Sequence, residues 1–404
     1  MNKRDPARTF VLYNALFSGG LAVICTAYVP WLVRLGLSLA EIAVVNTVFL
    51  IGGSLLELPT GMLADGKSRA WSVRIGVLVV TLACFGYAFA RGFWSAALCE
   101  AGCALGMAFV SGADQAWLTD ALTRRGEQNR VGQVLGTSLS WNAAVSLVIG
   151  CLGAPLAAVW PAGPWVASGL ILLVCLAVCV VRMDSSGEPM RRVSETEAFR
   201  QSWRIMRTRR TLAWTAIAAA TFGLVQAFNL YWPIRYQLMT GQMGLTWVWA
   251  ACYGSLVVAG WLVRRQRGGF GLETHGIAAA LLLAGLGLAG AGLVPAALGS
   301  IGFAMVHELG RGAFNPLLGG LTQRHVESEC RATYGSMQSL VGKAGFGLVV
   351  IALAVAFSDT TPSAEAVSAA WIVAGATLAL GAVVLWLARP RTVTATDETQ
   401  PIVP

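Results

Sequence analysis

Five ionisable residues lie deep within long apolar stretches of the chain: Glu100, His307, Glu308, Arg311 and Lys343. A charged side chain at the centre of a bilayer costs about 2.5 to 3.5 kcal/mol on insertion scales, so each of these residues is a candidate for function. A carboxylate in such surroundings can load and release a proton, a histidine can relay it, and an arginine or lysine can hold an anionic group. The chemistry expected of this set is therefore proton transfer and ligand binding.

Some of these residues also allow a purely structural interpretation. Glu308 and Arg311 stand three positions apart, which places them on one face of a helix, where they can form a closed ion pair. Lys343 shares a helical face with the small residues Ser339 and Gly347, which would admit a substrate carboxylate. Pairing of Lys343 with Glu308 is an equal alternative.

The elements that carry these residues follow from composition. Of the 404 residues, 56% are hydrophobic and 12% are charged, whereas soluble domains carry about a quarter charged residues. A soluble protein is therefore excluded. The net charge of +9 comes from 29 lysines and arginines in short clusters between apolar runs, a pattern that orients a membrane protein and does not form a nucleic-acid-binding domain.

Twelve apolar stretches are long enough to cross a bilayer as helices, which needs roughly 20 residues each. They cover residues 9–33, 40–58, 70–90, 93–112, 131–159, 164–181, 211–233, 244–263, 275–294, 296–318, 333–357 and 364–388. With the N-terminus inside, basic residues concentrate on the inner side, and the outer loops hold only Arg34, Arg91 and Arg235. Both termini are therefore predicted to be cytoplasmic.

The only long polar connection, residues 182–210, bisects the chain. We predict a six-helix bundle over 1–181, a cytoplasmic linker over 182–210, a second six-helix bundle over 211–388 and a cytoplasmic tail over 389–404. In the linker, Phe199, Trp203 and Met206 recur at helical spacing among arginines, which predicts an amphipathic helix on the inner leaflet. An unstructured basic linker is the alternative.

Cysteine usage and the motif inventory exclude several other functions. Eight of the nine cysteines fall inside apolar runs, and no histidine or further cysteine completes a metal site around them. The sequence has no Gly-x-Ser-x-Gly nucleophile motif and no phosphate-binding loop. We therefore expect neither an enzyme nor a bound metal or cofactor.

The loop after the second apolar stretch reads Gly61-Met62-Leu63-Ala64-Asp65-Gly66-Lys67-Ser68-Arg69. This loop resembles the signature loop of the major facilitator superfamily. Its matching residues are Gly61, Leu63, Ala64, Asp65 and Arg69, while Gly66, Ser68 and Ala70 depart from the family pattern. Residues 106–120 are similar to the end of helix 4 in many bacterial efflux-type members. A weak repeat, in which Leu122, Thr123, Arg125, Gly136 and Ser140 recur as Leu321, Thr322, Arg324, Gly335 and Ser339, indicates parallel halves.

This resemblance implies an all-α membrane protein with twelve transmembrane helices in two parallel-repeat six-helix bundles, working by alternating access. It also implies that Gly61, Asp65 and Arg69 form a gating loop. We expect Pro59 to end the second helix and Gly61 to allow a tight turn there. Asp65 would meet a helix N-terminus, and Arg69 would supply the opposing charge.

In the family, helices 1, 4, 7 and 10 line a central cavity, which would place Glu100 opposite His307, Glu308 and Arg311. We assign proton coupling to Glu100 and Glu308, with His307 as a relay. The candidate substrate-binding residues are Arg311, Lys343, Tyr13, Asn14, Trp141, Asn142, Gln226, Asn229, Phe314 and Asn315.

The sequence therefore predicts a monomeric secondary transporter of the bacterial inner membrane that exports a small amphiphilic organic compound or drug in exchange for protons. Its expected partners are that substrate, protons and membrane lipid, and not nucleic acid. One alternative is transport of a carboxylate-bearing metabolite such as a siderophore, motivated by Arg311 and Lys343. Another is a membrane receptor that has lost transport, motivated by the departures in the signature loop.

Overall fold

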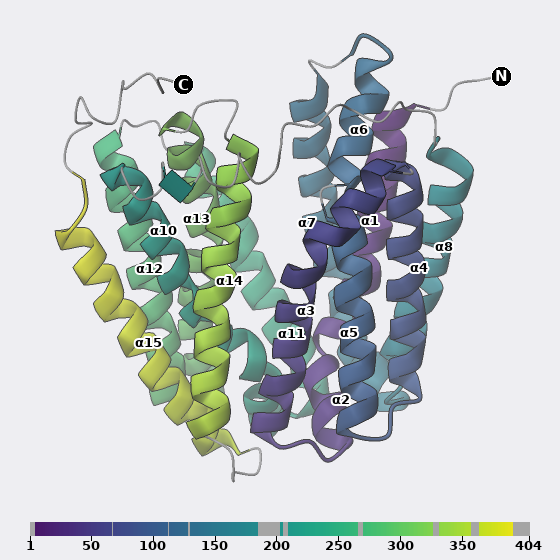
Figure 1. Ribbon diagram of the computed structural model, residues 1–404. Coiled ribbons are helices and arrows are strands. Elements are labelled where there is room, and N and C mark those ends of the chain that lie inside the picture. The colour runs from purple at the N-terminus through teal and green to yellow at the C-terminus, as the bar shows by residue number, and fades with distance from the viewer. Residues whose placement is uncertain are drawn as a thin grey trace. The chain divides into compact units, whose positions relative to one another are not determined.

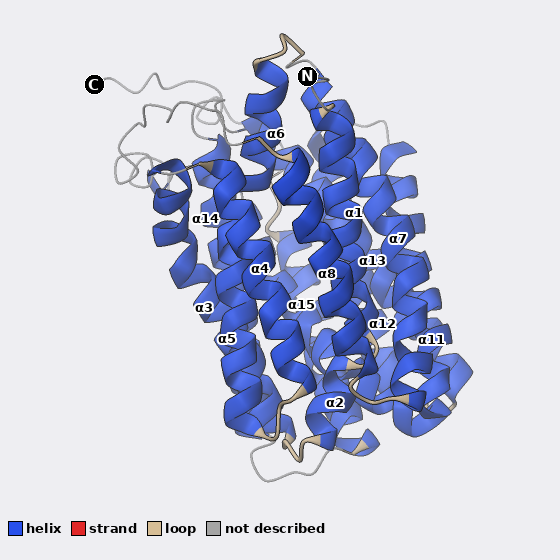
Figure 2. Cartoon of the chain, turned by 90° about the vertical axis from the view of Figure 1, so that its right-hand side faces the viewer, coloured by secondary structure: helices blue, strands red, loops and turns tan. Residues whose placement is uncertain are grey.

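The fold was analysed in a computed structural model of the chain. It describes residues 5–66, 68–111, 113–127, 130–184, 203–204, 209–265, 270–325, 331–356 and 363–390. Throughout these ranges the regular secondary structure is helical, and no strand occurs in them (Figure 2). The amphipathic helix expected around Phe199 and Met206 lies outside the described residues, apart from the helical turn at Trp203.

The chain forms two compact units. The first comprises Met1–Arg191 together with Tyr236–Ala250 and Ser358–Pro362, and the second comprises the remaining residues. The helices of the N-terminal part are α1 (Pro6–Cys25), α2 (Tyr28–Arg34), α3 (Leu39–Gly66), α4 (Arg69–Ala88), α5 (Phe93–Val110), α6 (Ala113–Thr123), α7 (Val131–Val159) and α8 (Gly163–Arg182). Within this first unit α1 packs on α7 and α8, and α4 packs on α5 and α8 (Figure 1).

The C-terminal part of the chain carries the remaining helices. They are α10 (Arg210–Phe222), the short 3-10 helix η2 (Gly223–Val225), α11 (Gln226–Arg265), α12 (Phe270–Leu293), α13 (Ala297–His325), α14 (Arg331–Ala356) and α15 (Ala364–Leu387). In the second unit α12 packs on both α13 and α15, and α10 packs on α14 (Figure 1). α12 is thus the central helix of this group.

Every one of the twelve predicted apolar stretches falls on helical structure, which confirms the predicted twelve-helix fold class. Among the described residues, eight helical stretches are long and apolar enough to cross a membrane. Some predicted boundaries are wrong in detail. The first predicted span consists of two helices, α1 and α2, and the fourth continues past its predicted end through α6 to Thr123.

Two proline positions explain further differences from the predicted boundaries. α3 does not end at Pro59 but continues through Gly61 to Gly66, so the predicted tight turn at Gly61 is wrong. Similarly, Pro233 lies inside α11, and Arg235 is a buried helical residue instead of an outer-loop residue. In both cases the helix accommodates the missing N–H of proline, as membrane helices can when neighbouring groups satisfy the backbone.

α11 changes unit along its length. It bends at Gly241, whose φ of 71° lies in the region that favours glycine. Its middle part, Tyr236–Ala250, belongs to the first unit, where Trp249 Nε1 donates to the Ser146 carbonyl of α7 at 3.2 Å. A side chain at Gly150 of α7 would collide with this indole ring, so the glycine makes room for it.

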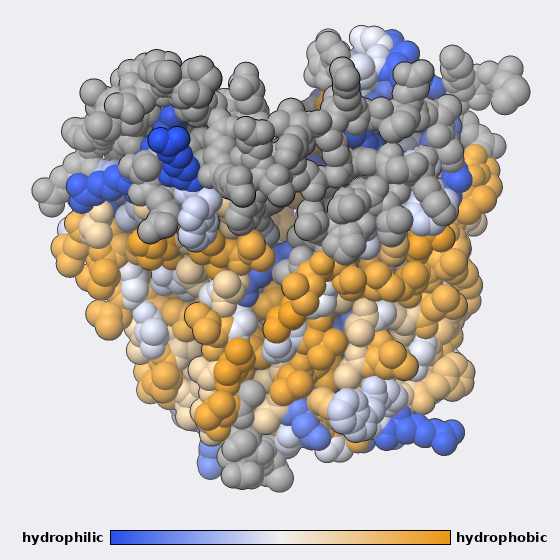
Figure 3. Space-filling view, viewed as in Figure 1, coloured by the Kyte–Doolittle hydropathy of each residue, from blue (hydrophilic) through white to orange (hydrophobic). Residues whose placement is uncertain are grey.

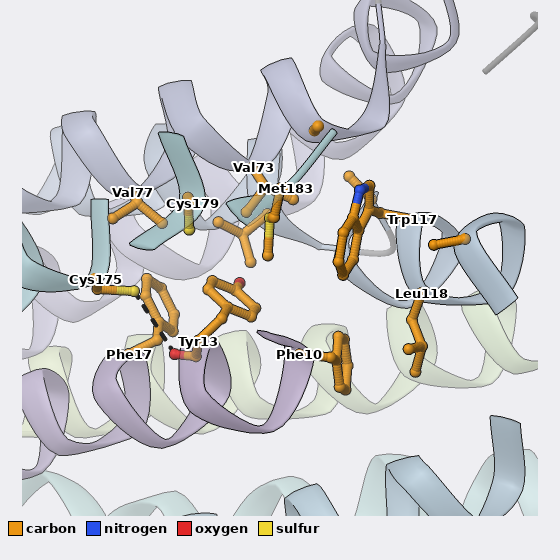
Figure 4. Packing of buried hydrophobic residues seen from close by; sticks show 14 of the residues in the cluster. Phe10, Tyr13, Phe17, Val73, Val77, Trp117, Leu118, Cys175, Cys179 and Met183 are labelled. Atoms are coloured by element: carbon orange, nitrogen blue, oxygen red, sulfur yellow. Dashed lines mark hydrogen bonds between the residues drawn. The ribbon is translucent and has the colours of Figure 1, made fainter. Parts of the chain in front are cut away.

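Large apolar side chains fill the interior of each unit. In the first unit, Phe10, Tyr13 and Phe17 of α1 pack against side chains of α4 and α8 that include Val77 and Cys175 (Figure 4). The second unit has a corresponding core formed by members of α10, α12, α13 and α15, among them Trp214, Leu281, Phe314 and Leu378. These clusters hold the polar residues described below in a low-dielectric setting.

The outer faces of the helices are apolar as well. Trp94, Leu98, Leu348 and Leu380 are each at least 66% exposed although they are hydrophobic. Figure 3 shows apolar side chains over the middle of the helices on the visible face, with polar side chains toward the helix ends. Exposed apolar surface of this extent is expected of a protein whose solvent is lipid.

Candidate functional site

Four of the residues proposed from the sequence form one polar network in the second unit. Arg311 of α13 contacts the Glu308 carboxylate oxygen Oε2 through both Nε and Nη2, each at 2.7 Å. Its Nη1 donates to Asn229 Oδ1 of α11 at 3.3 Å, and Asn229 Nδ2 donates to Gln226 Oε1 at 2.7 Å. The structure therefore brings Glu308, Arg311, Asn229 and Gln226 together.

The local sequence explains why this network lies inside the bundle. Glu308 and Arg311 stand at i and i+3 on α13, so their side chains share one face. Gly310 lies between them on another face, and a side chain there would collide with the α12 backbone at Ala280 and Ala284. Close helix packing buries Glu308 to 1% exposure, while the Arg311 side chain remains 27% exposed. The ion pair predicted as the structural alternative is therefore present, and its cation remains partly accessible.

His307 lies beside this network but faces α12. Its Nδ1 is 2.7 Å from the Ala284 carbonyl oxygen, and because a carbonyl can only accept, Nδ1 carries the hydrogen. Its Nε2 is buried without a hydrogen-bond partner among the described residues, and the ring packs on Phe228 with centroids 4.8 Å apart. Only Nε2 can therefore exchange a proton while the bond to Ala284 persists.

The other candidates in the second unit have separate surroundings. Phe314 is a core residue that stacks on Phe222, with ring centroids 4.1 Å apart. Asn315 is exposed, and Lys343 is half-buried on α14. The cation that pairs with Glu308 is Arg311, and the alternative pairing of Glu308 with Lys343 is not observed.

Glu100, the remaining coupling candidate, lies in the first unit and has a different environment. It is 8% exposed on α5, and its Oε2 accepts a hydrogen bond from the Tyr87 hydroxyl of α4. Tyr87 stacks on Trp165 of α8 at 4.1 Å and meets Tyr28 of α2 edge-on at 6.1 Å. Glu100 is thus turned toward aromatic side chains, and within the described residues it forms no salt bridge.

The candidates on α1 and α7 also differ in exposure. Tyr13 is fully buried in the apolar core, and Asn14 donates to the Phe10 carbonyl of its own helix at 3.2 Å. On α7, Trp141 is 56% exposed, and Asn142 is half-buried with no hydrogen-bond partner for its Oδ1 in the described part of the chain. These four residues belong to the first unit, whereas the Arg311 network belongs to the second.

Of the three residues assigned to the gating loop, Gly61, Asp65 and Arg69, the structure describes side-chain contacts for Arg69. The backbones of Gly61 and Asp65 belong to the last turns of α3, and the Asp65 side chain lies outside the described part. Arg69 at the start of α4 donates from Nη1 to Asp120 Oδ2 of α6 at 2.6 Å and to the Ala116 carbonyl at 3.1 Å. Asp120 is the last residue of the stretch 106–120, which resembles the end of helix 4 in the family. The sequence did not predict that it pairs with Arg69.

The eight long apolar helical stretches among the described residues indicate a multi-pass membrane protein. The sequence model of the Major Facilitator Superfamily matches residues 10–350, and the chain belongs to this family. A search of curated proteins found no match. Membership of this family indicates a transporter rather than an enzyme. It is also consistent with a small-molecule substrate.

Solved transporter structures share this fold at low sequence identity. A mutant of the nucleoside transporter NupG is 12% identical, with a TM-score of 0.79 over 95% of this chain and 100% of that chain. A bacterial homolog of the human lysosomal transporter Spinster is 14% identical, with a TM-score of 0.74 over 98% of both chains. A bacterial homologue of the iron transporter ferroportin is 16% identical, with a TM-score of 0.71 over 95% of this chain and 99% of that chain. These likenesses establish the fold and not the substrate.

Proposed function

We propose that the protein is a proton-coupled exporter of a small amphiphilic organic compound, acting in a bacterial inner membrane with both termini in the cytoplasm. The observation that carries this proposal is the Glu308–Arg311 pair, in which a carboxylate at 1% exposure is joined to a partly exposed guanidinium. A buried carboxylate is held as an anion by its cation, and a proton can take the place of that cation. Proton binding at Glu308 would therefore release Arg311.

Arg311 connects this proton switch to α11. Its bond to Asn229, and the bond from Asn229 to Gln226, link α13 to the first turn of α11. When Glu308 is ionised, its carboxylate can accept a hydrogen bond from the substrate or attract a positively charged group, and a proton on Glu308 removes that attraction. Alternate occupation of Glu308 by a proton and by the substrate would exchange the two across the membrane.

Glu100 is the second proposed proton carrier. Unlike Glu308, it is bonded to a phenol and not to an arginine. Its hydrogen-bond donor is the neutral Tyr87 phenol, so no formal positive charge opposes its ionisation penalty among the described residues. His307 is the proposed relay, through its Nε2. The proposal also includes the gating loop formed by Gly61, Asp65 and Arg69. The ion pair between Arg69 and Asp120 supports it, because this pair attaches one end of the loop to α6.

A second candidate function is transport of a carboxylate-bearing metabolite. The partly exposed guanidinium of Arg311 favours it, because a substrate carboxylate could replace Glu308 at the guanidinium nitrogens Nε and Nη2. Lys343 on α14 would then be a further binding charge. This alternative shares the fold and the Glu308–Arg311 pair with the first proposal, and it differs in that the substrate would bind Arg311 while Glu308 carries the proton.

The experiment is flux into proteoliposomes of known orientation under an imposed proton gradient. The probes are tetraphenylphosphonium, a neutral fluorescent dye and citrate, each tested with wild type, Glu308→Gln and Glu100→Gln. Proton-driven flux of the cation or the dye, lost in Glu308→Gln, is expected. Flux of citrate alone would select the carboxylate alternative, and pH-dependent flux that survives in the double variant would reject both carboxylates as carriers.

Exchange without a gradient tests the gate independently. Asp65→Asn should slow exchange of the transported probe while leaving its equilibrium binding largely intact, because the loop is proposed to control interconversion and not recognition. Arg69→Lys is the companion variant, since it keeps the charge but loses the planar geometry at Asp120. Loss of probe binding with an unchanged exchange rate would contradict the gate assignment.

A further inference from the structure

Arg235 of α11 is a buried cation that bonds oxygens of two other helices of the second unit. Its Nη2 donates to the carbonyls of Ala291 and Val294, at the end of α12, at 3.1 Å each. Its Nη1 donates to the Ala364 carbonyl at 3.2 Å and to the Ser368 hydroxyl, both on α15. Because Arg235 is only 4% exposed, one side chain fastens α11 to both α12 and α15 inside the protein.

The position of these acceptors explains how a guanidinium is accommodated there. The Ala291 carbonyl belongs to the last turn of α12 and has no helical donor, because Pro295 four positions later has no N–H. Carbonyls at a helix C-terminus also carry a negative partial charge, which favours a cation. A buried charge is costly unless it is hydrogen-bonded, so we expect Arg235 to stay attached to these oxygens.

A second contact from α15 holds α11 about two turns earlier. Trp371 is 0% exposed, and its Nε1 donates to the Ala227 carbonyl of α11 at 2.9 Å. The same indole packs on Phe228 with ring centroids 5.1 Å apart, and the Arg235 guanidinium lies 5.5 Å from its centroid. Ser368 and Trp371 stand at i and i+3, so one face of α15 contacts α11 at both levels.

The polar network lies between these two anchors, at a weak point of α11. Pro233 has no N–H, so the carbonyl of Asn229, four positions earlier, lacks its helical hydrogen bond. The Asn229 side chain accepts from Arg311 at 3.3 Å, which is longer than the usual range of about 2.7 to 3.2 Å, so a small displacement would break this bond. The anchors at Ala227 and Arg235 lie on either side of the weak point.

We propose that Arg235 and Trp371 are positioning residues of the transport site. By fixing α11 on both sides of Pro233, they hold Asn229 within hydrogen-bond distance of Arg311. Both are buried, so they act through α11 and not by contact with the substrate. This proposal deepens the proposed function, on which it rests, by naming the side chains that keep Arg311 oriented beside its carboxylate.

Two tryptophan variants provide a matched comparison. Trp371→Phe keeps an aromatic ring beside Phe228 and loses the donor to Ala227. Trp214→Phe is the control, because Trp214 Nε1 of α10 donates to the Leu385 carbonyl of α15 at the same distance of 2.9 Å. Trp214 is also buried, at 4% exposure. Both variants therefore remove an indole–carbonyl bond between α15 and a neighbouring helix, and only the first bond lies beside the polar network.

Thermal unfolding of the full-length protein in detergent tests the contact without any substrate. Each tryptophan variant should lower Tm by about 2 °C, as expected for one hydrogen bond. The losses of Trp371→Phe and Asn229→Ala should add to less than their sum, because the first change already displaces Asn229. The losses of Trp214→Phe and Asn229→Ala should be additive. Additive losses in both pairs would overturn the proposal.

Flux kinetics give a second measurement, which a purely structural role would not change. The probe is the one among tetraphenylphosphonium, the neutral dye and citrate that the wild type transports. Trp371→Phe should raise KM about fivefold and leave kcat within about twofold, because Arg311 is no longer held in place. Trp214→Phe should leave both constants within about twofold. The same KM in the two variants would contradict the positioning role.

Arg235→Lys tests the other anchor. It keeps the positive charge and loses the planar fork that reaches two helices, so it should raise KM as Trp371→Phe does. Ser368→Ala removes one acceptor of the same guanidinium and replaces Arg235→Lys if that variant does not fold. A wild-type KM in both variants would exclude Arg235 from the positioning role.

Two results separate this proposal from the proposed function. Non-additive Tm losses of Trp371→Phe and Asn229→Ala in a protein without proton-driven flux would support the positioning contact and reject the exporter proposal. Proton-driven flux that requires Glu308, together with a wild-type KM and additive Tm losses for Trp371→Phe, would overturn the positioning role and leave the exporter proposal standing.

Discussion

The two units solve the problem of a buried carboxylate in different ways. In the second unit, Glu308 is neutralised by Arg311 through two contacts of 2.7 Å, and the pair extends to Asn229. In the first unit, Glu100 accepts a hydrogen bond from Tyr87, whose ring contacts the rings of Trp165 and Tyr28. A charge-paired carboxylate depends on its partner for its ionisation, whereas a phenol-bonded carboxylate can be neutral without leaving a charge uncompensated.

The largest effect should come from removing the cation of the second unit. Arg311→Ala leaves Glu308 buried without a counter-charge, and breaking a buried pair in this way costs about 3 to 5 kcal/mol of unfolding free energy. The loss should be smaller at low pH, because protonation of Glu308 removes the uncompensated charge. Thermal unfolding in detergent at pH 5 and pH 8 measures both parts of the prediction.

A double variant provides the control. Glu308→Gln combined with Arg311→Gln removes both charges, so most of the stability lost in Arg311→Ala should return. If the double variant is as unstable as Arg311→Ala, the loss comes from packing of the arginine and not from an unpaired charge.

A smaller effect is expected in the first unit. Tyr87→Phe removes the donor to Glu100 and should lower the unfolding free energy by about 1 to 2 kcal/mol. Tyr13→Phe is the matched control, since the Tyr13 hydroxyl of α1 is buried without a hydrogen-bond partner among the described residues and its removal should cost less. Equal losses in the two variants would remove the distinction drawn here between the carboxylate environments.

The smallest effect should come from the partly exposed ion pair of the signature loop. Arg69 and Asp120 side chains are 23% and 34% exposed, so Asp120→Asn should change the unfolding free energy by only about 0.2 to 1 kcal/mol. Added salt should reduce the difference between wild type and variant. A loss as large as that of Arg311→Ala would show that this pair belongs with the buried pair of the second unit.

The sequence predicted the fold class because a bilayer demands long apolar helices, and twelve such stretches stand out in composition. It also predicted the Glu308–Arg311 alternative, because i, i+3 spacing on a helix fixes the neighbourhood of two side chains. The end of α3 was predicted wrongly, because Pro59 was taken to end the helix, and the span predicted over 211–233 stops at Pro233, which lies inside α11.

Contacts between distant helices could not be predicted from spacing. The bonds from Tyr87 to Glu100 and from Arg69 to Asp120 depend on which helix faces are turned toward each other. Periodicity is weak in a helix that is apolar on all sides, so it does not identify the inward face. Tyr13 shows the consequence, since its polar group indicated a lining residue and the structure places it in the apolar core.

The course of α11 has a consequence for recombination between related transporters. Residues Tyr236–Ala250 follow the central linker in the sequence, yet they belong to the first compact unit and seat Trp249 over Gly150 of α7. A chimera joined at the linker would keep one parent's α7 and acquire the other parent's α11, and any bulkier residue at position 150 would meet the indole. The structural units that could be exchanged between related transporters therefore differ from the two halves of the sequence.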